Sequence, residues 1–282
     1  MQKQHTLADA ASLAGVSLHT GEKVTLTIRP APVDHGFKFR RTDLKDQPTV
    51  DALAANVRTV ERSTTLIEGN VKVHTVEHIL SALTGLGVDN ALIEMDANEP
   101  PIGDGSAAPY VALIKKAGIV EQDAPRRYCE IREPVAIQSK NGSILVILPD
   151  SKFRVSCTQA GPDGNHTQYL SLEITPETYE KEIAPARTFG FKDQVEQLRA
   201  AGLIQGGALD NALVCDGERW LNPPLRFADE PVRHKLLDLL GDLALAGLPR
   251  AQVFAYRGSH GLHTALAAAL AEAFGSDAVP AT

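Results

Sequence analysis

The order of predicted secondary-structure elements occurs twice in this chain of 282 residues. Each half reads as β-strands, an amphipathic helix, a buried strand, a loop with glycine and serine, and a second helix. The predicted helices span 74–87 and 107–117 in the first half, and 231–246 and 264–274 in the second. This order predicts an α+β fold built from two similar halves. Because unrelated α+β units often share such an order, the pattern alone leaves a true duplication open.

The boundary between the halves is predicted near residue 124. The stretch 121–127 is charged, contains Pro125 and lacks the periodicity of a helix or a strand. We therefore expect a first domain over 1–124 and a second over 125–282. The second domain carries an extra segment, about 184–229, and insertions of this size often select the substrate.

Composition excludes several classes of protein. The chain has 28 basic and 35 acidic residues, a net charge of −7, so its composition does not indicate binding to nucleic acid or to an anionic membrane. A small anionic substrate would need a few local basic residues. No apolar run approaches the ~18 residues of a membrane-spanning helix, and the first residues lack the apolar run of a signal peptide. Its three cysteines are widely spaced and odd in number, which is typical of reduced thiols. We expect a cytoplasmic protein without a nucleic-acid partner or an obligate protein partner.

Separate pieces of the chain carry side chains suited to one open metal site. His234 and Asp238 are four residues apart in a predicted helix, so their side chains lie on one face. A neutral imidazole and a carboxylate are ordinary zinc ligands, and a third ligand would complete a catalytic site that keeps one position for water. His78 holds a comparable place in the first predicted helix and is the candidate third ligand. A solvated polar helix face has the same pattern, so the spacing alone does not decide.

Two further residues are candidates for acid–base chemistry. Glu77 precedes His78, and a carboxylate beside a metal-activated water is a general base in zinc hydrolases. Adjacent Glu and His are nevertheless common on helices. His260 follows a strand in Gly-Ser-His-Gly, where glycines let the backbone approach a ligand, although an exposed loop histidine also fits. Asp242, one turn beyond Asp238, could hydrogen-bond a second histidine.

The remaining histidines give weaker signals. The spacing around His19 does not decide its role. We interpret the others as surface or capping residues: His5, His35, His74, His166 and His263.

A glycine-containing stretch offers an alternative function. Residues 101–108 open a helix and faintly resemble a phosphate-binding loop. They lack the Walker lysine and the fuller glycine pattern, so we interpret them as a capped turn. A metal-free small-molecule kinase built on this loop stays as an alternative. A metallopeptidase loses its main support, because the His-Glu-x-x-His pattern is missing around Glu77.

Seven sequence blocks appear in the order found in one known family. They are SLHTG at 17–21, TVEH at 75–78, GVDN at 87–90, DGSA at 104–107, ARTFGF at 186–191, HKLLD at 234–238 with GD at 241–242, and SH at 259–260. Together, from about residue 4 to residue 270, they resemble the UDP-3-O-acyl-N-acetylglucosamine deacetylases of lipid A biosynthesis. The resemblance implies two α+β halves packed with their helices sandwiched between two sheets, each half with an insertion. It also implies zinc-dependent hydrolysis of the substrate's N-acetyl group with release of acetate, the committed step of lipid A biosynthesis.

The resemblance further implies roles for individual residues. The zinc ligands would be His78, His234 and Asp238, a set that Fe²⁺ would also tolerate. Glu77 would be the general base and His260 the general acid or electrostatic stabiliser, oriented by Asp242. Thr188 would bind the oxyanion, with Lys235 assisting nearby. The remaining set would contact the substrate: His19 and Phe189 near the metal and sugar, Arg257 near the diphosphate, and Val195, Leu198, Ile204, Gly207, Ala212 and Val214 along an apolar tunnel for the 3-O-acyl chain.

The chain departs from the usual family pattern at a few places. Gln194 stands where aspartate is usual, Gly103 replaces a larger apolar residue, and the loop 159–166 looks shortened. These departures affect substrate contacts and acyl preference rather than the metal-centred set. A catalytically silent UDP-sugar-binding relative is a further alternative, against which the complete set of Glu77, Thr188 and His260 with three metal ligands argues.

Overall fold

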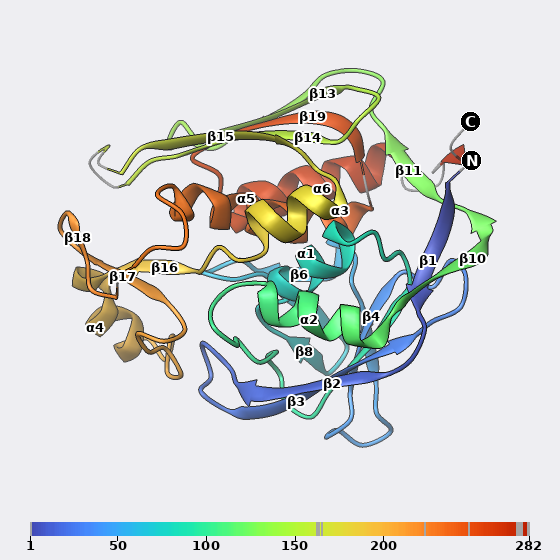
Figure 1. The fold of residues 1–282 in the computed structure, drawn as a ribbon, viewed down its shortest axis with the longest axis horizontal. Helices are drawn as coiled ribbons and strands as arrows, with labels where there is room; N and C mark the ends of the chain where they lie inside the picture. Colours follow the sequence, from blue (N-terminus) through green and yellow to red (C-terminus); the bar gives the residue numbers. More distant parts are fainter. Residues whose placement is uncertain are drawn as a thin grey trace.

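The computed structural model describes residues 2–161, 164, 166–222, 224–247, 249–274 and 279–280. Two main β-sheets form the outer layers, and the helices lie between them (Figure 1). The apolar side chains of both sheets and of the intervening helices form one continuous core. No helix among the described residues combines the length and apolarity needed to cross a membrane.

The first half forms the sheet with strand order β2-β3-β9-β4-β5. Strand β9 is antiparallel to β3 and parallel to β4. Its alternating burial puts one face on the helices, as expected for a sheet covered on one side. The elements of this half are β1 (Lys3–Leu7), β2 (Ala11–Val16), β3 (Lys23–Pro30), β4 (Phe37–Arg41), β5 (Thr49–Asp51), η1 (Ala54–Asn56), β6 (Val57–Thr59), β7 (Thr65–Glu68), β8 (Val71–Val73), α1 (Glu77–Gly85), β9 (Ala91–Met95), α2 (Ala108–Ala117) and β10 (Ile119–Pro125).

The second half repeats this topology. Its central strand, β19, is antiparallel to β13 and parallel to β14, and β12 and β15 pair outside them. The elements are β11 (Arg127–Glu130), β12 (Val135–Gln138), β13 (Ile144–Pro149), β14 (Arg154–Gln159), β15 (Gln168–Glu173), α3 (Pro176–Thr178), η2 (Tyr179–Ile183), β16 (Phe189–Phe191), α4 (Lys192–Ala200), β17 (Leu213–Asp216), β18 (Arg219–Trp220), α5 (Glu230–Leu243), η3 (Ala244–Ala246), β19 (Pro249–Tyr256), α6 (His260–Phe274) and β20 (Val279–Pro280).

Each half carries an insertion just before its central helix. In the first half this is the three-stranded sheet β6-β7-β8, and in the second it is β16-β17-β18 with α4, at the left of Figure 1. The predicted α+β class, with similar halves, sandwiched helices and an insertion in each, is confirmed. The three cysteines are buried and unpaired, as predicted.

The sequence suggested an irregular segment at the charged stretch 121–127 near the predicted boundary. This suggestion was wrong, because most of the stretch belongs to strands β10 and β11. Strand β10 pairs with β1 in an antiparallel two-stranded ribbon. Strand β10 is largely exposed, and Lys3 of β1 forms ion pairs with Glu121 and Asp123 along it. No residue of β10 is buried, so the strand lacks the apolar alternation by which a sequence pattern reveals a strand.

The closest contact between the halves is the packing of α1 against α5 in the middle of the sandwich. Every residue of α1 is buried. On α5, Gly241 lies so close that a Cβ there would sit 2.0 Å from the backbone oxygen of Glu77. A glycine at this point therefore permits the approach that brings the two helices, and the polar side chains on them, together.

We expect Gly241→Ala to destabilise the protein by about 1–3 kcal/mol or more, because overpacking a rigid helix contact forces the backbones apart. It should also weaken metal binding. Urea denaturation and a zinc titration would measure both effects. Gly261→Ala is the matched control: its Cβ would come no closer than 3.4 Å to Val60, so stability should hold or rise by up to ~1 kcal/mol. Equal stability losses in the two variants would contradict the close-contact explanation.

Candidate metal centre

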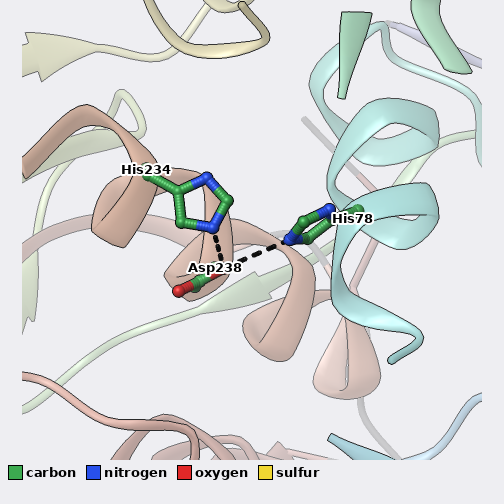
Figure 2. A group of neighbouring side chains, drawn as sticks. All are labelled: His78, His234 and Asp238. Carbon is green, nitrogen blue, oxygen red and sulfur yellow. Dashed lines mark ion pairs between the residues drawn. The ribbon is translucent and has the colours of Figure 1, made fainter. Parts of the chain in front are cut away.

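The three candidate ligands converge where α1 meets α5. His78 lies in the first turn of α1, and His234 and Asp238 lie one turn apart on α5 (Figure 2). Nε2 of His234 is 3.3 Å from Oδ1 of Asp238, and Nε2 of His78 is 3.8 Å from the same oxygen. One donor atom from each residue lies within 4.8 Å of the others. Two imidazole nitrogens and a carboxylate oxygen at such separations fit a single divalent cation.

Neighbouring groups orient these ligands. Nδ1 of His234 donates to the Ala186 carbonyl at 3.0 Å, which leaves Nε2 free to bind a metal. Nζ of Lys235 donates to Oδ2 of Asp238 at 2.7 Å, which leaves Oδ1 facing the two histidines. Lys235 also lies over the ring of Phe189, 5.4 Å from its centroid. Lys235 thus contacts the candidate ligand Asp238 directly.

The protonation states of the ligands suit a cation. Burial, reinforced by His234, lowers the pKa of His78 to about 3. Burial also lowers the pKa of His234. Burial would raise the pKa of Asp238, but the positive charge of Lys235 and the nearby His234 hold it well below its usual range. Neutral imidazoles beside an ionised carboxylate are the forms in which these side chains bind metals.

Glu77 is the first residue of α1 and lies beside the donor atoms of the three candidate ligands. Its Oε2 accepts the backbone N–H of Thr64 at 3.0 Å, and its Oε1 is 3.9 Å from Nε2 of His260. Burial raises the pKa of Glu77 to about 8. The charge of His260 lowers this pKa, whereas the carboxylates of Asp242 and Asp238 raise it further. A carboxyl group poised in this range can exchange a proton near neutral pH.

His260 bridges Asp242 and the centre. Its Nδ1 is 2.8 Å from Oδ2 of Asp242, while its Nε2 is 4.0 Å from Oδ2 of Asp238. Burial would lower the pKa of His260, but the carboxylates of Asp242 and Glu77 raise it to about 9. His260 is the first residue of α6, because that helix begins four residues earlier than predicted. It is buried rather than exposed.

The environment of Asp242 contains two residues that the sequence did not single out. Oγ1 of Thr64 donates to Oδ1 of Asp242 at 2.5 Å. His263 is 2% exposed and its Nδ1 lies 3.0 Å from Oδ2 of Asp242. The interpretation of His263 as a surface residue was therefore wrong. Its place one turn after His260 on α6 was the available signal, hidden because the predicted helix started too late.

The segment with Thr188 and Phe189 enters the site from the insertion. The N–H of Thr188 donates to the Gly105 carbonyl, and its own carbonyl accepts from Leu213. The ring of Phe189 lies 6.4 Å from that of His234. Arg187 anchors the segment through a buried ion pair with Glu230 at 2.8 Å. Phe189 is thus held beside His234, and Thr188 precedes it on the same anchored segment.

The loop 101–108 has a structural part in this arrangement. Gly105 has φ +87°, and a Cβ there would lie 2.1 Å from the Asn211 carbonyl oxygen. Asp104 pairs with Arg226 at 2.6 Å. The loop therefore joins the first half to the insertion of the second, in agreement with its interpretation as a turn. Because the loop 101–108 packs against the insertion, it gives no support to the kinase alternative.

His19 lies on a loop that a buried carboxylate holds. Glu99, 0% exposed, accepts the backbone N–H groups of His19 and Thr20 and the hydroxyl of Thr75. The Ile204 N–H donates to Nδ1 of His19 at 3.3 Å. His19 thus links the first half to the insertion. The sequence reasoning did not single out Glu99.

The six residues predicted to line an acyl tunnel lie on or near α4 and β17. All are half-buried: Val195, Leu198, Ile204, Gly207, Ala212 and Val214. Arg257 follows β19, has φ +53° and donates its backbone N–H to the Thr158 carbonyl. Gln194 accepts a hydrogen bond from Arg62 across the two insertions. Positions 162, 163 and 165 of the shortened loop lie outside the described residues.

Comparison with known proteins agrees along nearly the whole chain. The family model described as UDP-3-O-acyl N-acetylglycosamine deacetylase matches residues 4–272. A protein of Thermosynechococcus vestitus is 47% identical over 275 residues, covering 95% of this chain and 94% of its own. One from a Nostoc species is 48% identical, covering 94% and 97%, and one from Saccharophagus degradans is 46% identical, covering 93% and 88%. All three are named UDP-3-O-acyl-N-acetylglucosamine deacetylase.

Proposed function

This chain belongs to the UDP-3-O-acyl-N-acetylglucosamine deacetylase family, and we propose that it hydrolyses the N-acetyl group of that substrate at the centre formed by His78, His234 and Asp238. The products are acetate and the free amine. This reaction is a step of lipid A biosynthesis. The convergence of three buried donor atoms, with Glu77 and His260 against them, is the observation that carries the assignment of the site.

The donor set fits zinc, and iron(II) would bind the same groups. When bound there, zinc would supply a water with a pKa lowered toward ~7 and would polarise the acetamide carbonyl. We assign the ligand roles to the Nε2 atoms of His78 and His234 and to Oδ1 of Asp238. Lys235 keeps Asp238 ionised, with Oδ1 facing His78 and His234.

Glu77 is assigned as the general base. The Thr64 N–H holds Oε2, which orients Oε1 toward the space beside the donors, where the attacking water gives up its proton. A bound cation would lower the pKa of Glu77 from about 8, because it favours the carboxylate. Thr188 is assigned to the oxyanion of the tetrahedral intermediate, a contact that can supply ~3 kcal/mol. Lys235 assists near it.

His260 is assigned as the general acid. Its raised pKa keeps the ring protonated at neutral pH, and Nε2, which faces the centre, can give its proton to the departing amine. Asp242 holds the ring in this orientation through Nδ1.

We expect His260→Ala to lower kcat by about 10²- to 10⁴-fold, the range for loss of a positioned acid, with a much smaller change in KM. In the unaltered protein kcat should fall on the alkaline side as His260 loses its proton, below about pH 9, because a bound cation would lower the raised pKa of His260. The variant should lack this alkaline limb. Steady-state kinetics from pH 6 to 10, with zinc content measured in parallel, would test this. Unchanged turnover at full zinc content would remove His260 from the mechanism.

The insertion is proposed to select the 3-O-acyl chain. The half-buried Val195, Leu198 and Ile204 lie on or just beyond α4, and a channel of apolar side chains suits a lipid. His19 and Phe189 would lie beside the sugar, and Arg257 near the diphosphate. We also propose that the protein acts in the cytoplasm, with domains over 1–124 and 125–282.

An acetate-release assay on UDP-3-O-acyl-N-acetylglucosamine tests the assignment. We expect acetate release that a chelator abolishes and added zinc restores. Substrate binding without acetate release at full metal content would instead indicate a silent UDP-sugar-binding protein. Nucleotide turnover that depends on ATP would indicate a kinase.

A further inference from the structure

Asp242 is shared by two histidines, and only His260 has a role in the reaction proposed above. His263 lies three residues farther along α6, and both Nδ1 atoms approach the same oxygen, Oδ2, at 2.8 Å and 3.0 Å. Thr64 occupies the other oxygen. Asp242 itself is 0% exposed. Three donors therefore fix this carboxylate, and His263 is one of the two that act on the oxygen facing His260.

His263 is itself closely confined. It is 2% exposed, and a Cβ on Gly258 would lie 2.4 Å from its Nε2. Its ring stands edge-on to that of His260, with centroids 6.1 Å apart. Burial lowers the pKa of His263, so its ring is neutral and carries its single proton on Nδ1, where Asp242 accepts it. The ring therefore acts as a fixed, uncharged donor.

We propose that His263 is a positioning residue for the deacetylation assigned to this site. By donating Nδ1–H to Oδ2, it keeps Asp242 in the orientation that receives Nδ1–H of His260. Nε2 of His260 is thereby held toward Glu77 and Asp238. Without that donor the carboxylate can turn, and the acid loses its alignment with the amine. His263 acts only through Asp242 and does not touch the reacting atoms.

Side-chain substitutions separate positioning from simple packing. His263→Leu removes the donor, and we expect kcat to fall about 10- to 100-fold with little change in KM, the usual range for groups that orient catalytic residues. The amide nitrogen of His263→Asn can take the place of Nδ1, so kcat should recover to near the original value. His263→Gln puts its amide nitrogen near the Nε2 position and should behave like His263→Leu. If His263→Leu fails to fold, comparing kcat of His263→Asn with kcat of His263→Gln still tests the proposal. Equal kcat values in those two variants would overturn it.

A double-variant cycle gives a second test. In a His260→Ala background the positioned ring is gone, so adding His263→Leu should change kcat by less than about twofold. A merely structural role predicts the same 10- to 100-fold loss in both backgrounds. Equal losses in both backgrounds would overturn the proposal.

A spectroscopic readout is independent of activity. In ¹⁵N-histidine-labelled, zinc-loaded protein, the Nδ1–H proton resonance of His260 should shift in His263→Leu and return in His263→Asn. An unchanged His260 resonance in His263→Leu would overturn the proposal. Acetate release by the unaltered protein tests the proposed function, and the His260 resonance tests the positioning role of His263. A protein without acetate release could still show the expected resonance shift, so failure of the proposed function is distinguishable from failure of this inference.

Discussion

His78→Ala should lose stable zinc binding and about 10³-fold or more in kcat/KM. Removing one of three protein ligands leaves two donors, both on α5. The ion then loses its link to α1. Loss of several kcal/mol of transition-state charge stabilisation corresponds to at least this factor. Substitution of His234 or Asp238 should have an effect of the same order.

Zinc content after dialysis, together with acetate release, measures the effect of His78→Ala. His35→Ala is the matched control, because His35 is a half-buried histidine that lines a different cavity. It should keep full zinc content and activity. Full zinc content in His78→Ala would mean that His78 is not a ligand, and the assigned centre would then be wrong.

Glu77→Gln should lower kcat by about 10²- to 10⁴-fold while zinc binding is retained, because the amide cannot accept the proton of the attacking water. The amide oxygen can still accept the N–H of Thr64, so the local structure should persist. Glu133→Gln, at an exposed position, is the control and should be silent.

The stability of metal-free Glu77→Gln provides a second check, and its sign follows from the raised pKa. The folded protein binds the Glu77 proton more tightly than the unfolded chain does, so this group's contribution to stability is full below the ordinary pKa of 4.5 and is lost as pH rises through about 8. A neutral glutamine lacks this loss. Above pH 8 the metal-free variant should therefore be at least as stable as the unaltered protein by thermal denaturation. Lower stability together with lost zinc would indicate a packing role for Glu77 instead.

Local spacing made part of the site predictable. His234 and Asp238 are one helical turn apart on α5, and such a pair shares a helix face whatever the rest of the fold does. The repeated order of elements likewise predicted two similar halves, because alternation and helical periodicity arise from burial on one side. The residue roles came from resemblance to a family, and they stay predictions until the variants above are made.

Other features had no local signal. Thr64 and Glu99 are 0% exposed and hold Asp242 and the His19 loop, but a buried threonine or glutamate looks like any surface one in the sequence. His263 was assigned to the surface because the predicted helix began at residue 264, after both His260 and His263. Its partner, Asp242, is 21 residues away along the chain.

The chain alone determined which side chains can share a helix face and where helices and buried strands recur. The tertiary structure decided which faces meet. Gly241 lets α5 approach Glu77 of α1, and that contact brings His78 to Asp238 across 160 residues. Periodicity reports the environment of one element at a time. The distance between two elements depends on the packing of both, and only the folded molecule specifies it.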